Sequence, residues 1–204
     1  MFRRQSKSRN SPAAPWLPSR ALMSLGVAVS LLSASLALQA QGIATLEYRV
    51  KASYLAKFPS FVEWPEPALP PGDAPFLLCV FGEYPFGISL AETTRGATIH
   101  QRPIETRWVH KEQDLLACQI LFVTRSEKKR YRHVLEIVSA QKVLTVGETP
   151  DFLDAGGIVS FSMEKEILRF EVNLEEADKA HLKISSRLLS LARRVVPRTE
   201  AAKS

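Results

Sequence analysis

Residues that commonly carry out catalysis or bind metal are few in this sequence and widely spaced. The four histidines lie ten or more residues apart, and none has a second histidine or a cysteine at a helical ligand spacing. The chain also lacks a Walker lysine loop, a dinucleotide-binding glycine loop and the G-x-S-x-G turn of serine hydrolases. We therefore expect a non-enzymatic protein without a metal or cofactor. The histidines are His100, His110, His133 and His181.

One acidic turn, residues 147–157, is the best local candidate for a cation site. It carries Glu148, Asp151 and Asp154, whose carboxylates could gather around a metal cation or an amine. The alternative is a solvated loop after the end of a strand, in which Pro150 and the glycines make the turn. We favour the solvated loop.

The stretch KFPSFVEWPEP, residues 57–67, places three large aromatic side chains among three prolines. In one interpretation Phe58, Phe61 and Trp64 pack the end of a helix against a sheet, where each ring buries on the order of 150–250 Å². In the other they form an exposed patch for a partner protein, and Trp64 is shared between core and interface. We favour the core. A lipid-binding role is disfavoured because the segment lacks the basic face of an interfacial helix.

The first forty residues have the composition of an export signal. Five basic residues and no acidic ones accompany an apolar run at residues 21–38, and Ser35, Ala37 or Ala40 offers a cleavage point. An uncleaved membrane anchor is the alternative, because a run of about 18 residues is the lower limit for a span. We predict that residues 1–40 are a cleaved signal peptide and that the protein is periplasmic.

Charge and cysteine content follow from this export prediction. Without residues 1–40 the chain has 22 basic and 21 acidic residues, a net charge of about +1, so its high overall pI does not indicate nucleic-acid binding. Cys79 and Cys118 both lie in apolar runs, where two buried thiols are one possibility. We favour a disulfide, because exported chains fold under oxidising conditions.

The remaining basic cluster, KKRYRH at residues 128–133, has a structural explanation. Four apolar residues follow at helical spacing, which predicts an amphipathic helix that opens at Ser126 and turns its bases toward solvent. We therefore expect no nucleic-acid partner. The apolar positions are Tyr131, Val134, Leu135 and Val138.

The elements that would position these residues form an α/β pattern. Residues 75–82 and 119–124 are wholly apolar and predict buried strands; the second is followed by the basic-backed helix and a strand at 142–148. Strand, helix, strand is typical of a parallel pair with its crossover helix. We predict one α/β domain over residues 43–196 and a disordered tail over 197–204.

The flanking segments predict further elements. A long first helix is expected to kink at Pro59, a half-exposed strand near residues 97–110 to break at Pro103, and a hairpin to turn at Glu164–Lys165. Asn173 and Ser185 are expected to cap two C-terminal helices, the second carrying Leu188, Leu189, Ala192 and Val195 on its apolar side and stopping at Pro197. The first helix is predicted from apolar positions Ile43, Leu46, Val50, Tyr54, Phe58, Phe61 and Val62.

Three of these segments together resemble the YfiR family of bacterial periplasmic regulators. They are VKASYLAKFPSFVEWP at residues 50–65, FLLCVFG at 76–82, and the C-terminal run GGIVSFSMEKEILRFEVNLEEADKAHLKISSRLLSLARR at 156–194. The last is the most specific, because its Gly-led hairpin, F-E-V-N-L, L-K-I-S-S and leucine-rich end arrive in order. The likeness spans almost the whole of the predicted mature chain.

The resemblance implies a three-layer α/β sandwich with a mixed, partly parallel sheet, which forms homodimers and regulates without catalysis. Members bind the periplasmic region of an inner-membrane diguanylate cyclase and hold it inactive, so that cyclic di-GMP falls. An outer-membrane, peptidoglycan-binding lipoprotein can sequester them and release the cyclase. The alternative function that we retain is a small-ligand-binding module that reports to a membrane receptor or histidine kinase.

Two sets of positions carry over from the family. Cys79 and Cys118 occupy the positions of a family disulfide, and an apolar groove for the lipoprotein matches Leu174, Ala177, Ile184, Ser186 and Leu189. A second cysteine pair of some members is missing, since Leu153 and Ser160 stand in that neighbourhood. A redox switch through that pair is therefore not expected.

Overall fold

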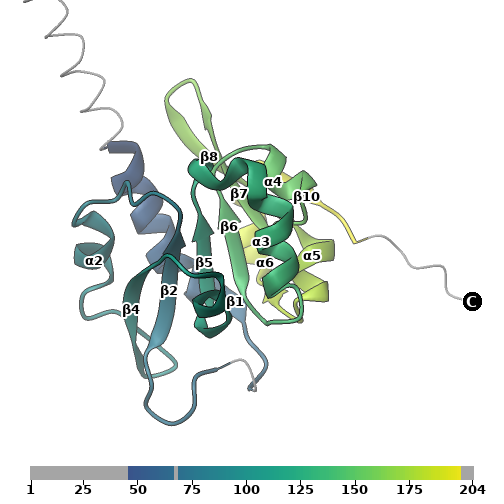
Figure 1. Ribbon diagram of the computed structural model, residues 1–204. Helices are drawn as coiled ribbons and strands as arrows, with labels where there is room; N and C mark the ends of the chain where they lie inside the picture. The colour runs from purple at the N-terminus through teal and green to yellow at the C-terminus, as the bar shows by residue number, and fades with distance from the viewer. Residues whose placement is uncertain (1–45, 67–68, 199–204) are drawn as a thin grey trace, which may run out of the picture. The chain divides into compact units, whose positions relative to one another are not determined.

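The computed structural model describes residues 46–66 and 69–198 (Figure 1). The predicted signal peptide, residues 1–40, lies outside them, as do residues 199–204 of the predicted tail. None of the helices in the described part of the chain is long and apolar enough to cross a membrane.

An eight-stranded mixed sheet, flanked by helices, forms the centre of the fold, which confirms the predicted α/β class. Its strand order is β10-β8-β7-β6-β5-β2-β4-β3. Strands β4, β2, β5, β6 and β7 are parallel, whereas β3 and β8 run antiparallel to β4 and β7, and β10 runs parallel to β8. The strands are β2 (Phe76–Phe81), β3 (Thr98–Ile99), β4 (Arg102–Val109), β5 (Ile120–Val123), β6 (Leu144–Gly147), β7 (Val159–Glu164), β8 (Ile167–Asn173) and β10 (Arg194–Val196).

Helical segments cover both faces of this sheet and make three layers (Figure 1). Alternate residues of β2 point to opposite faces, so Leu78 packs in one apolar cluster and Cys79 in the other. The Leu78 side carries the first helix (residues 46–57), η1 (Phe58–Phe61), α2 (Ser89–Thr94), α5 (Leu174–Lys179) and α6 (Ser186–Leu189). The Cys79 side carries η3 (Glu112–Ala117), α3 (Tyr131–Val138) and α4 (Asp151–Asp154).

The predicted strand–helix–strand unit is confirmed. Strands β5 and β6 pair in parallel on either side of α3 in the chain, and the four apolar positions that the sequence assigned to its inner face are buried. The basic residues before it form η4 (Arg125–Arg130), a 3-10 helix, so the α-helix begins at Tyr131 instead of Ser126. The basic cluster is the solvated side of this segment, as predicted.

The first helix differs from the prediction in the face that it buries. Leu46 is 60% exposed and Val50 37% exposed, whereas Lys51, Ala52 and Leu55 are buried. The apolar periodicity was misleading because a lysine lies on the inner face, where a buried carboxylate neutralises it. At Pro59 the helix does not kink; it passes into the 3-10 turn η1, which leaves the missing proline N–H without consequence.

Three other local predictions were wrong in detail. Pro103 lies inside β4, and the break in this segment is the turn at His100–Gln101, both with positive φ, between β3 and β4. The β7–β8 hairpin turns at Lys165–Glu166, one residue later than predicted. The final helix is only one turn long, because residues 194–196 form strand β10, which pairs in parallel with the end of β8.

The predicted disulfide is present between Cys79 on β2 and Cys118, two residues before β5. The two Cα atoms lie 5.9 Å apart and both residues are buried on the α3 side of the sheet. The bridge therefore ties together neighbouring parallel strands that 39 residues separate in sequence.

Candidate partner-binding surface

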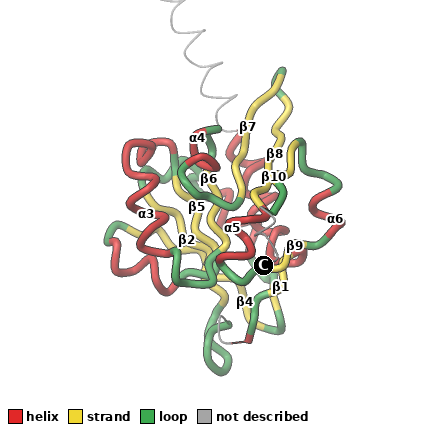
Figure 2. The backbone as a smooth tube through the Cα atoms, turned by 90° about the vertical axis from the view of Figure 1, so that its right-hand side faces the viewer, coloured by secondary structure: helices red, strands yellow, loops and turns green. Residues whose placement is uncertain are grey.

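The C-terminal segment contains two capped helices, and a small sheet between them joins it to the residues that follow η1. Asn173 Oδ1 accepts a hydrogen bond from the Glu176 amide at 3.2 Å, and Ser185 Oγ accepts one from the Leu188 amide at 3.3 Å, as predicted for caps of α5 and α6. Between these helices β9 (Lys183–Ile184) pairs with β1 (Val62–Glu63). Figure 2 shows β1 and β9 side by side near α6.

The five groove positions taken from the family likeness lie on α5, β9 and α6, but with different exposure. Leu174, Ile184 and Leu189 are half-buried and pack against the same apolar cluster. Ser186 is exposed. Ala177 is fully buried, so it packs in the core beneath this surface and cannot contact a partner. Pairing between Ile184 and Val62 brings this segment next to η1.

A groove of about 390 Å³ lies where the first helix and η1 meet α6. Phe58 and Leu188 form its buried floor, Tyr54 and Phe61 its half-buried walls, and Leu191, 61% exposed, its rim. An exposed leucine beside aromatic walls is typical of the centre of a protein–protein contact.

Two cations complete the rim of this groove. Lys57 and Arg187 are exposed, and neither has an ion-pair partner within residues 46–66 and 69–198. The Arg187 guanidinium lies 5.9 Å from the centroid of the Phe61 ring. The groove therefore fits an apolar side chain flanked by carboxylates. Sequence reasoning missed Lys57, Arg187 and Leu191, because only the packing of α6 on η1 brings them together.

The three aromatic residues of the 57–67 stretch have separate environments. Phe58 is buried and stacks on Phe161 at a centroid distance of 5.7 Å. Trp64 is also buried, and its Nε1 donates a hydrogen bond to the Lys142 carbonyl at 3.1 Å. Phe61, instead of Trp64, is the aromatic residue with a face at the surface groove.

A buried ionic cluster joins the first helix to the carboxyl end of β6. Lys51 is 1% exposed, and its Nζ lies 2.5 Å from Glu148 Oε2 and 2.5 Å from Glu47 Oε1. The Tyr48 hydroxyl donates to Glu148 Oε2 at 2.8 Å, and the Arg125 amide donates to Glu148 Oε1 at 2.8 Å. Every short contact of the Glu148 carboxylate is therefore with a donor.

These contacts set the ionisation of the cluster. Burial opposes the charge on Glu148, but the Lys51 ammonium and hydrogen bonds from Lys51 and Arg125 outweigh it, so the pKa of this carboxyl is lowered. Burial, reinforced by the Glu148 carboxylate, raises the pKa of the Tyr48 phenol. The cluster thus holds an ionised pair inside the protein.

The acidic turn does not form a metal site. Glu148 is buried and binds the Lys51 amine, whereas Asp151 pairs with Lys128 at 2.5 Å. The described residues contain no group of histidine, cysteine, aspartate or glutamate side chains that could hold a metal ion. The solvated-loop interpretation was wrong for Glu148, since its carboxylate takes up an amine from a helix almost 100 residues earlier.

The carboxyl ends of β2 and β5 are where many α/β proteins bind ligands, because the connections there leave on opposite faces. In this chain Gly82, with φ +99°, follows β2 and lies against the side chains that follow β5. A Cβ at Gly82 would lie 2.2 Å from Thr124 Oγ1 and 2.6 Å from Ser126 Oγ. Ser126 Oγ also accepts a hydrogen bond from the Glu83 amide at 3.0 Å. The space between the carboxyl ends of β2 and β5 is therefore filled by the side chains of Thr124 and Ser126.

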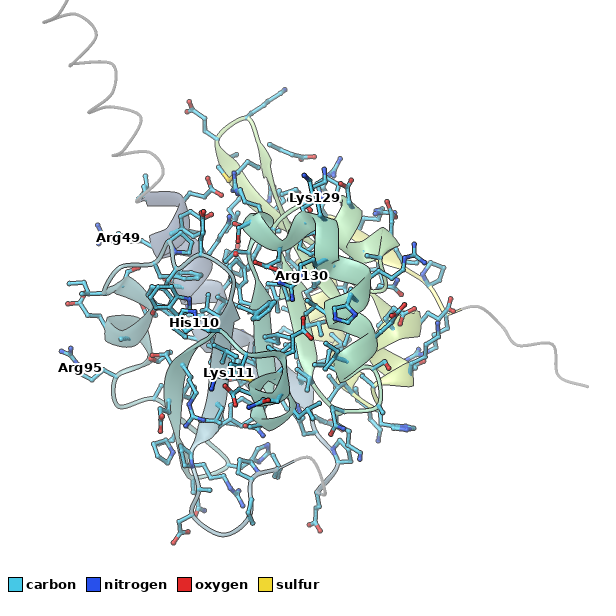
Figure 3. The ribbon with its side chains drawn as sticks, viewed as in Figure 1. Arg49, Arg95, His110, Lys111, Lys129 and Arg130 are labelled. Atoms are coloured by element: carbon cyan, nitrogen blue, oxygen red, sulfur yellow. A yellow bond between two sulfur atoms is a disulfide. The ribbon has the colours of Figure 1, made fainter. Side chains whose placement is uncertain are left out.

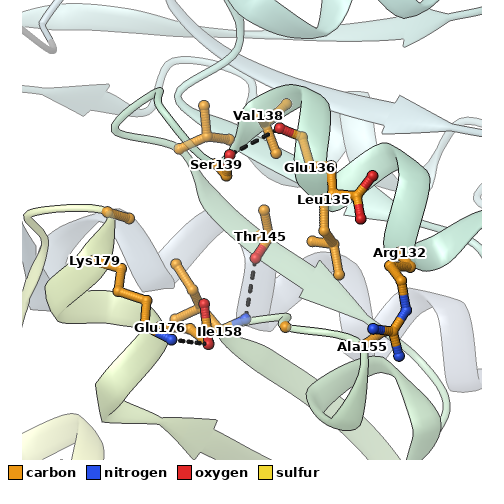
Figure 4. A pocket seen from close by; sticks show the side chains of 13 residues that line it. Arg132, Leu135, Glu136, Val138, Ser139, Thr145, Ala155, Ile158, Glu176 and Lys179 are labelled. Carbon is orange, nitrogen blue, oxygen red and sulfur yellow. Dashed lines mark hydrogen bonds and ion pairs between the residues drawn. The ribbon is translucent and has the colours of Figure 1, made fainter.

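A separate cleft of about 260 Å³ lies between α3, the α4–β7 loop and α5 (Figure 4). Leu135, Val138 and Ile158 give it apolar walls, and the exposed Arg132 and Glu136 stand at its rim. At its base the Ile158 amide donates a hydrogen bond to Thr145 Oγ1 at 3.0 Å. At about 260 Å³ the cleft is smaller than a typical ligand pocket of about 300–1,000 Å³, so its mixed polarity suits only a very small polar ligand.

Comparison with known proteins identifies one family. The sequence model of the YfiR/HmsC-like family matches residues 48–193. No curated protein matches the chain. A conserved domain protein from Vibrio cholerae O1 biovar El Tor is 12% identical over 63% of this chain and 56% of its own, with a TM-score of 0.44.

A second solved structure is the ABC domain in complex with L-Trp from Streptococcus pneumoniae. It is 10% identical over 59% of this chain and 55% of its own, with a TM-score of 0.45. This chain thus spans little more than half the length of either protein, and both likenesses are too weak to support an argument.

Proposed function

The chain belongs to the YfiR/HmsC-like family, and we propose that it binds the periplasmic region of an inner-membrane diguanylate cyclase and keeps the cyclase inactive. Members of this family are periplasmic regulators of cyclic di-GMP signalling that act with a membrane partner. Inhibition by such a protein lowers cyclic di-GMP. An outer-membrane lipoprotein releases the cyclase by competing for the regulator.

The observation that carries the proposal is the groove between η1 and α6. It combines an apolar floor, the exposed Leu191 and two cations, Lys57 and Arg187, that have no ion-pair partner among the described residues, on a support of buried aromatic rings. Its neighbours Ser186 and Leu189 come from the positions that match the lipoprotein groove of the family. A protein partner with an acidic, apolar-tipped segment fits this surface.

Regulation requires only a difference in affinity. If the protein binds the inactive form of the cyclase about 100-fold more tightly than the active form, it shifts that equilibrium by roughly 2.7 kcal/mol. In this proposal the groove acts by contact alone. A lipoprotein that covers this groove, with Leu191 at its rim, removes the regulator from the cyclase by mass action.

The decisive experiment measures cellular cyclic di-GMP in a deletion strain. Deletion is expected to raise it, and the full-length gene, but not a version without residues 1–40, is expected to reverse the rise. Leu191→Asp is expected to fail in complementation while the circular dichroism of the purified protein is unchanged, because this leucine is exposed. Leu116→Asp is the matched control, because Leu116 is 48% exposed on η3 on the opposite face. Unchanged cyclic di-GMP after deletion would refute the cyclase as target.

The cleft of Figure 4 supports the second candidate, a small-ligand-binding module. A ligand at 100 times its Kd is expected to stabilise the protein by about 2.7 kcal/mol, which a thermal shift screen of metabolites detects. Arg132→Ala is expected to abolish such a shift without lowering the melting temperature, because this arginine is exposed. A hit that survives this substitution would place the ligand elsewhere.

A further inference from the structure

The outer side of β4 is an open strand edge. Strand β3 pairs with only the first two residues of β4, and one further backbone bond runs from the Ile104 amide to the Ala97 carbonyl at 3.0 Å. The Ala97 amide donates to the Thr94 carbonyl, because the chain has just left α2. Among the residues that the structure describes, residues 105–109 of β4 therefore have no strand partner on this side (Figure 1).

The backbone of this edge presents hydrogen-bonding groups at the spacing of a strand. Successive residues of a strand turn their N–H and C=O groups to opposite sides. Ile104 turns its N–H away from β2 and toward Ala97, so Thr106 and Trp108 turn theirs outward as well. Within the described ranges no backbone carbonyl accepts a hydrogen bond from the Thr106 or Trp108 amide. Free N–H and C=O groups at this spacing are a template for an incoming strand.

Trp108 gives the edge an anchored aromatic surface. This residue is 51% exposed, although its Nε1 donates a hydrogen bond to the Gly82 carbonyl at 2.8 Å. Tyr84 and His110, the residue after β4, flank the indole ring at centroid distances of 5.4 and 4.4 Å (Figure 3). An aromatic ring held in this way is a favourable cross-strand neighbour for an apolar residue of an added strand.

Glu105 and Arg107 lie on the other face of β4 from Trp108 and give the edge a charge pattern. Both side chains are exposed, and Arg107 Nη2 lies 3.2 Å from Glu105 Oε1. An exposed ion pair contributes little stability, so each side chain can take a new partner across the edge. Opposite charges in cross-strand positions stabilise a pair of strands, whereas like charges destabilise it. The edge therefore favours a strand with an acidic residue opposite Arg107 and a basic residue opposite Glu105.

We propose that residues 104–109 accept an extended segment of a partner protein as an added antiparallel strand. From its N-terminus the segment carries an apolar residue opposite Trp108, then an acidic residue opposite Arg107 and, two residues later, a basic residue opposite Glu105. The antiparallel direction is slightly more stable per residue than the parallel one, and strand addition is a recurrent mode of peptide recognition. The inference goes beyond the proposed function, because β4 contributes no residue to the η1–α6 groove.

Two features favour an extended peptide over other occupants. The free groups of the edge are a row of backbone donors and acceptors, which a second backbone pairs and an apolar surface leaves without partners. The two exposed charges of the edge are one acid and one base, whereas a surface that binds anionic lipid carries an excess of lysine and arginine.

Two designed peptides with blocked ends test this register in NMR titrations of the full-length protein. Thr-Val-Glu-Val-Lys-Val-Thr places its glutamate opposite Arg107 and its lysine opposite Glu105, whereas Thr-Val-Lys-Val-Glu-Val-Thr has the same composition but places like charges opposite each other. We expect the first peptide to bind with a dissociation constant below about 1 mM and to protect the Thr106 and Trp108 amides from hydrogen exchange. The second is expected to bind about tenfold more weakly. Absence of binding by the first peptide, or equal binding of both, would overturn the proposal.

Variants of the protein test the same contact from the other side. Thr106→Pro removes an N–H that faces away from β2, so it is expected to abolish binding of the first peptide, whereas the matched Thr106→Val retains it. The double variant Glu105→Arg/Arg107→Glu leaves the backbone unchanged and is expected to invert the preference between the two peptides, which keeps the test valid even if the proline variant does not fold. An unchanged preference, or wild-type binding by a folded Thr106→Pro protein, would refute the proposal. Self-association that Thr106→Pro abolishes, without binding of either peptide, would assign the edge to a second copy instead.

Discussion

Replacing Glu148 by glutamine tests whether the buried ionic cluster stabilises the fold. The substitution keeps the shape of the side chain but removes the charge that neutralises Lys51, which is 1% exposed. Among the described residues, Lys51 then retains only Glu47 as a counter-charge. It also turns one of the two oxygens into a donor, although Lys51, Tyr48 and the Arg125 amide all donate to this carboxylate. At least one donor must then lose its acceptor.

The expected loss of stability follows from these contacts. Removing one partner of a buried ion pair costs about 3–5 kcal/mol, and an unsatisfied buried donor alone about 1–3 kcal/mol. We expect Glu148→Gln to lower the free energy of unfolding by about 3 kcal/mol, toward the low end because Glu47 remains. At about 2–4 °C per kcal/mol this lowers the melting temperature by roughly 6–12 °C.

Urea denaturation followed by circular dichroism, with the disulfide intact, measures this loss. The double variant Lys51→Met/Glu148→Gln is expected to recover part of it, because a buried pair replaced by neutral groups is often tolerated. Glu63→Gln is the control, since this carboxylate is exposed and 3.9 Å from Lys183. A Glu148→Gln protein within 1 kcal/mol of wild type would refute the reasoning.

The pH dependence gives the same test a second readout. Because the pKa of Glu148 is lowered in the folded protein, the carboxylate stabilises the fold above the unfolded value of about 4.5, and this contribution is lost as the pH falls through and below that value. Wild-type stability should therefore decline more steeply than that of Glu148→Gln below about pH 4.5. Parallel declines would show that Glu148 is not the group responsible.

Two further substitutions have definite expected outcomes. Loss of the Cys79–Cys118 bridge, by reduction or by the double alanine variant, is expected to lower the free energy of unfolding by about 4 kcal/mol. This value follows from the chain entropy of a loop closed over 39 residues. A loss below about 1 kcal/mol in urea denaturation would contradict it. Gly82→Ala is expected to lower the melting temperature by more than about 5 °C, because φ at this residue is +99° and the new Cβ would lie 2.2 Å from Thr124 Oγ1. Gly72→Ala is the control for backbone strain alone, because φ there is +55° and a new Cβ would have no neighbouring atom within 4 Å.

The sheet could be predicted from the sequence because its signal is local. Residues 76–81 and 120–123 are apolar at every position, and both are strands buried on both faces. The inner face of α3 and the caps at Asn173 and Ser185 were also predicted, since each depends on a few neighbouring residues. These are the elements for which local preference and tertiary packing agree.

The first helix and the candidate surface could not be predicted in this way, because long-range contacts decide them. Lys51 is buried only because Glu148, 97 residues later, neutralises it, and that pairing turns Leu46 and Val50 toward solvent. Likewise Val195 joins a strand instead of a helix because β8 offers it an unpaired edge. Helical periodicity does not report either of these contacts.

The two ends of the sheet determine how this protein can meet other chains. One end is β3, with two residues, and the other is β10, with three residues and Pro197 directly after it. However, β3 pairs only with Arg102 and Pro103 of the eight-residue β4, and β10 pairs only with the last three residues of β8. Within the described part of the chain, most of the outer side of β4 therefore has no strand partner, which leaves room for an incoming strand of about 5–6 residues. Protection against strand-to-strand polymerisation must then come from charged side chains on β4, such as the exposed Glu105 and Arg107, because charges on an edge strand oppose such pairing.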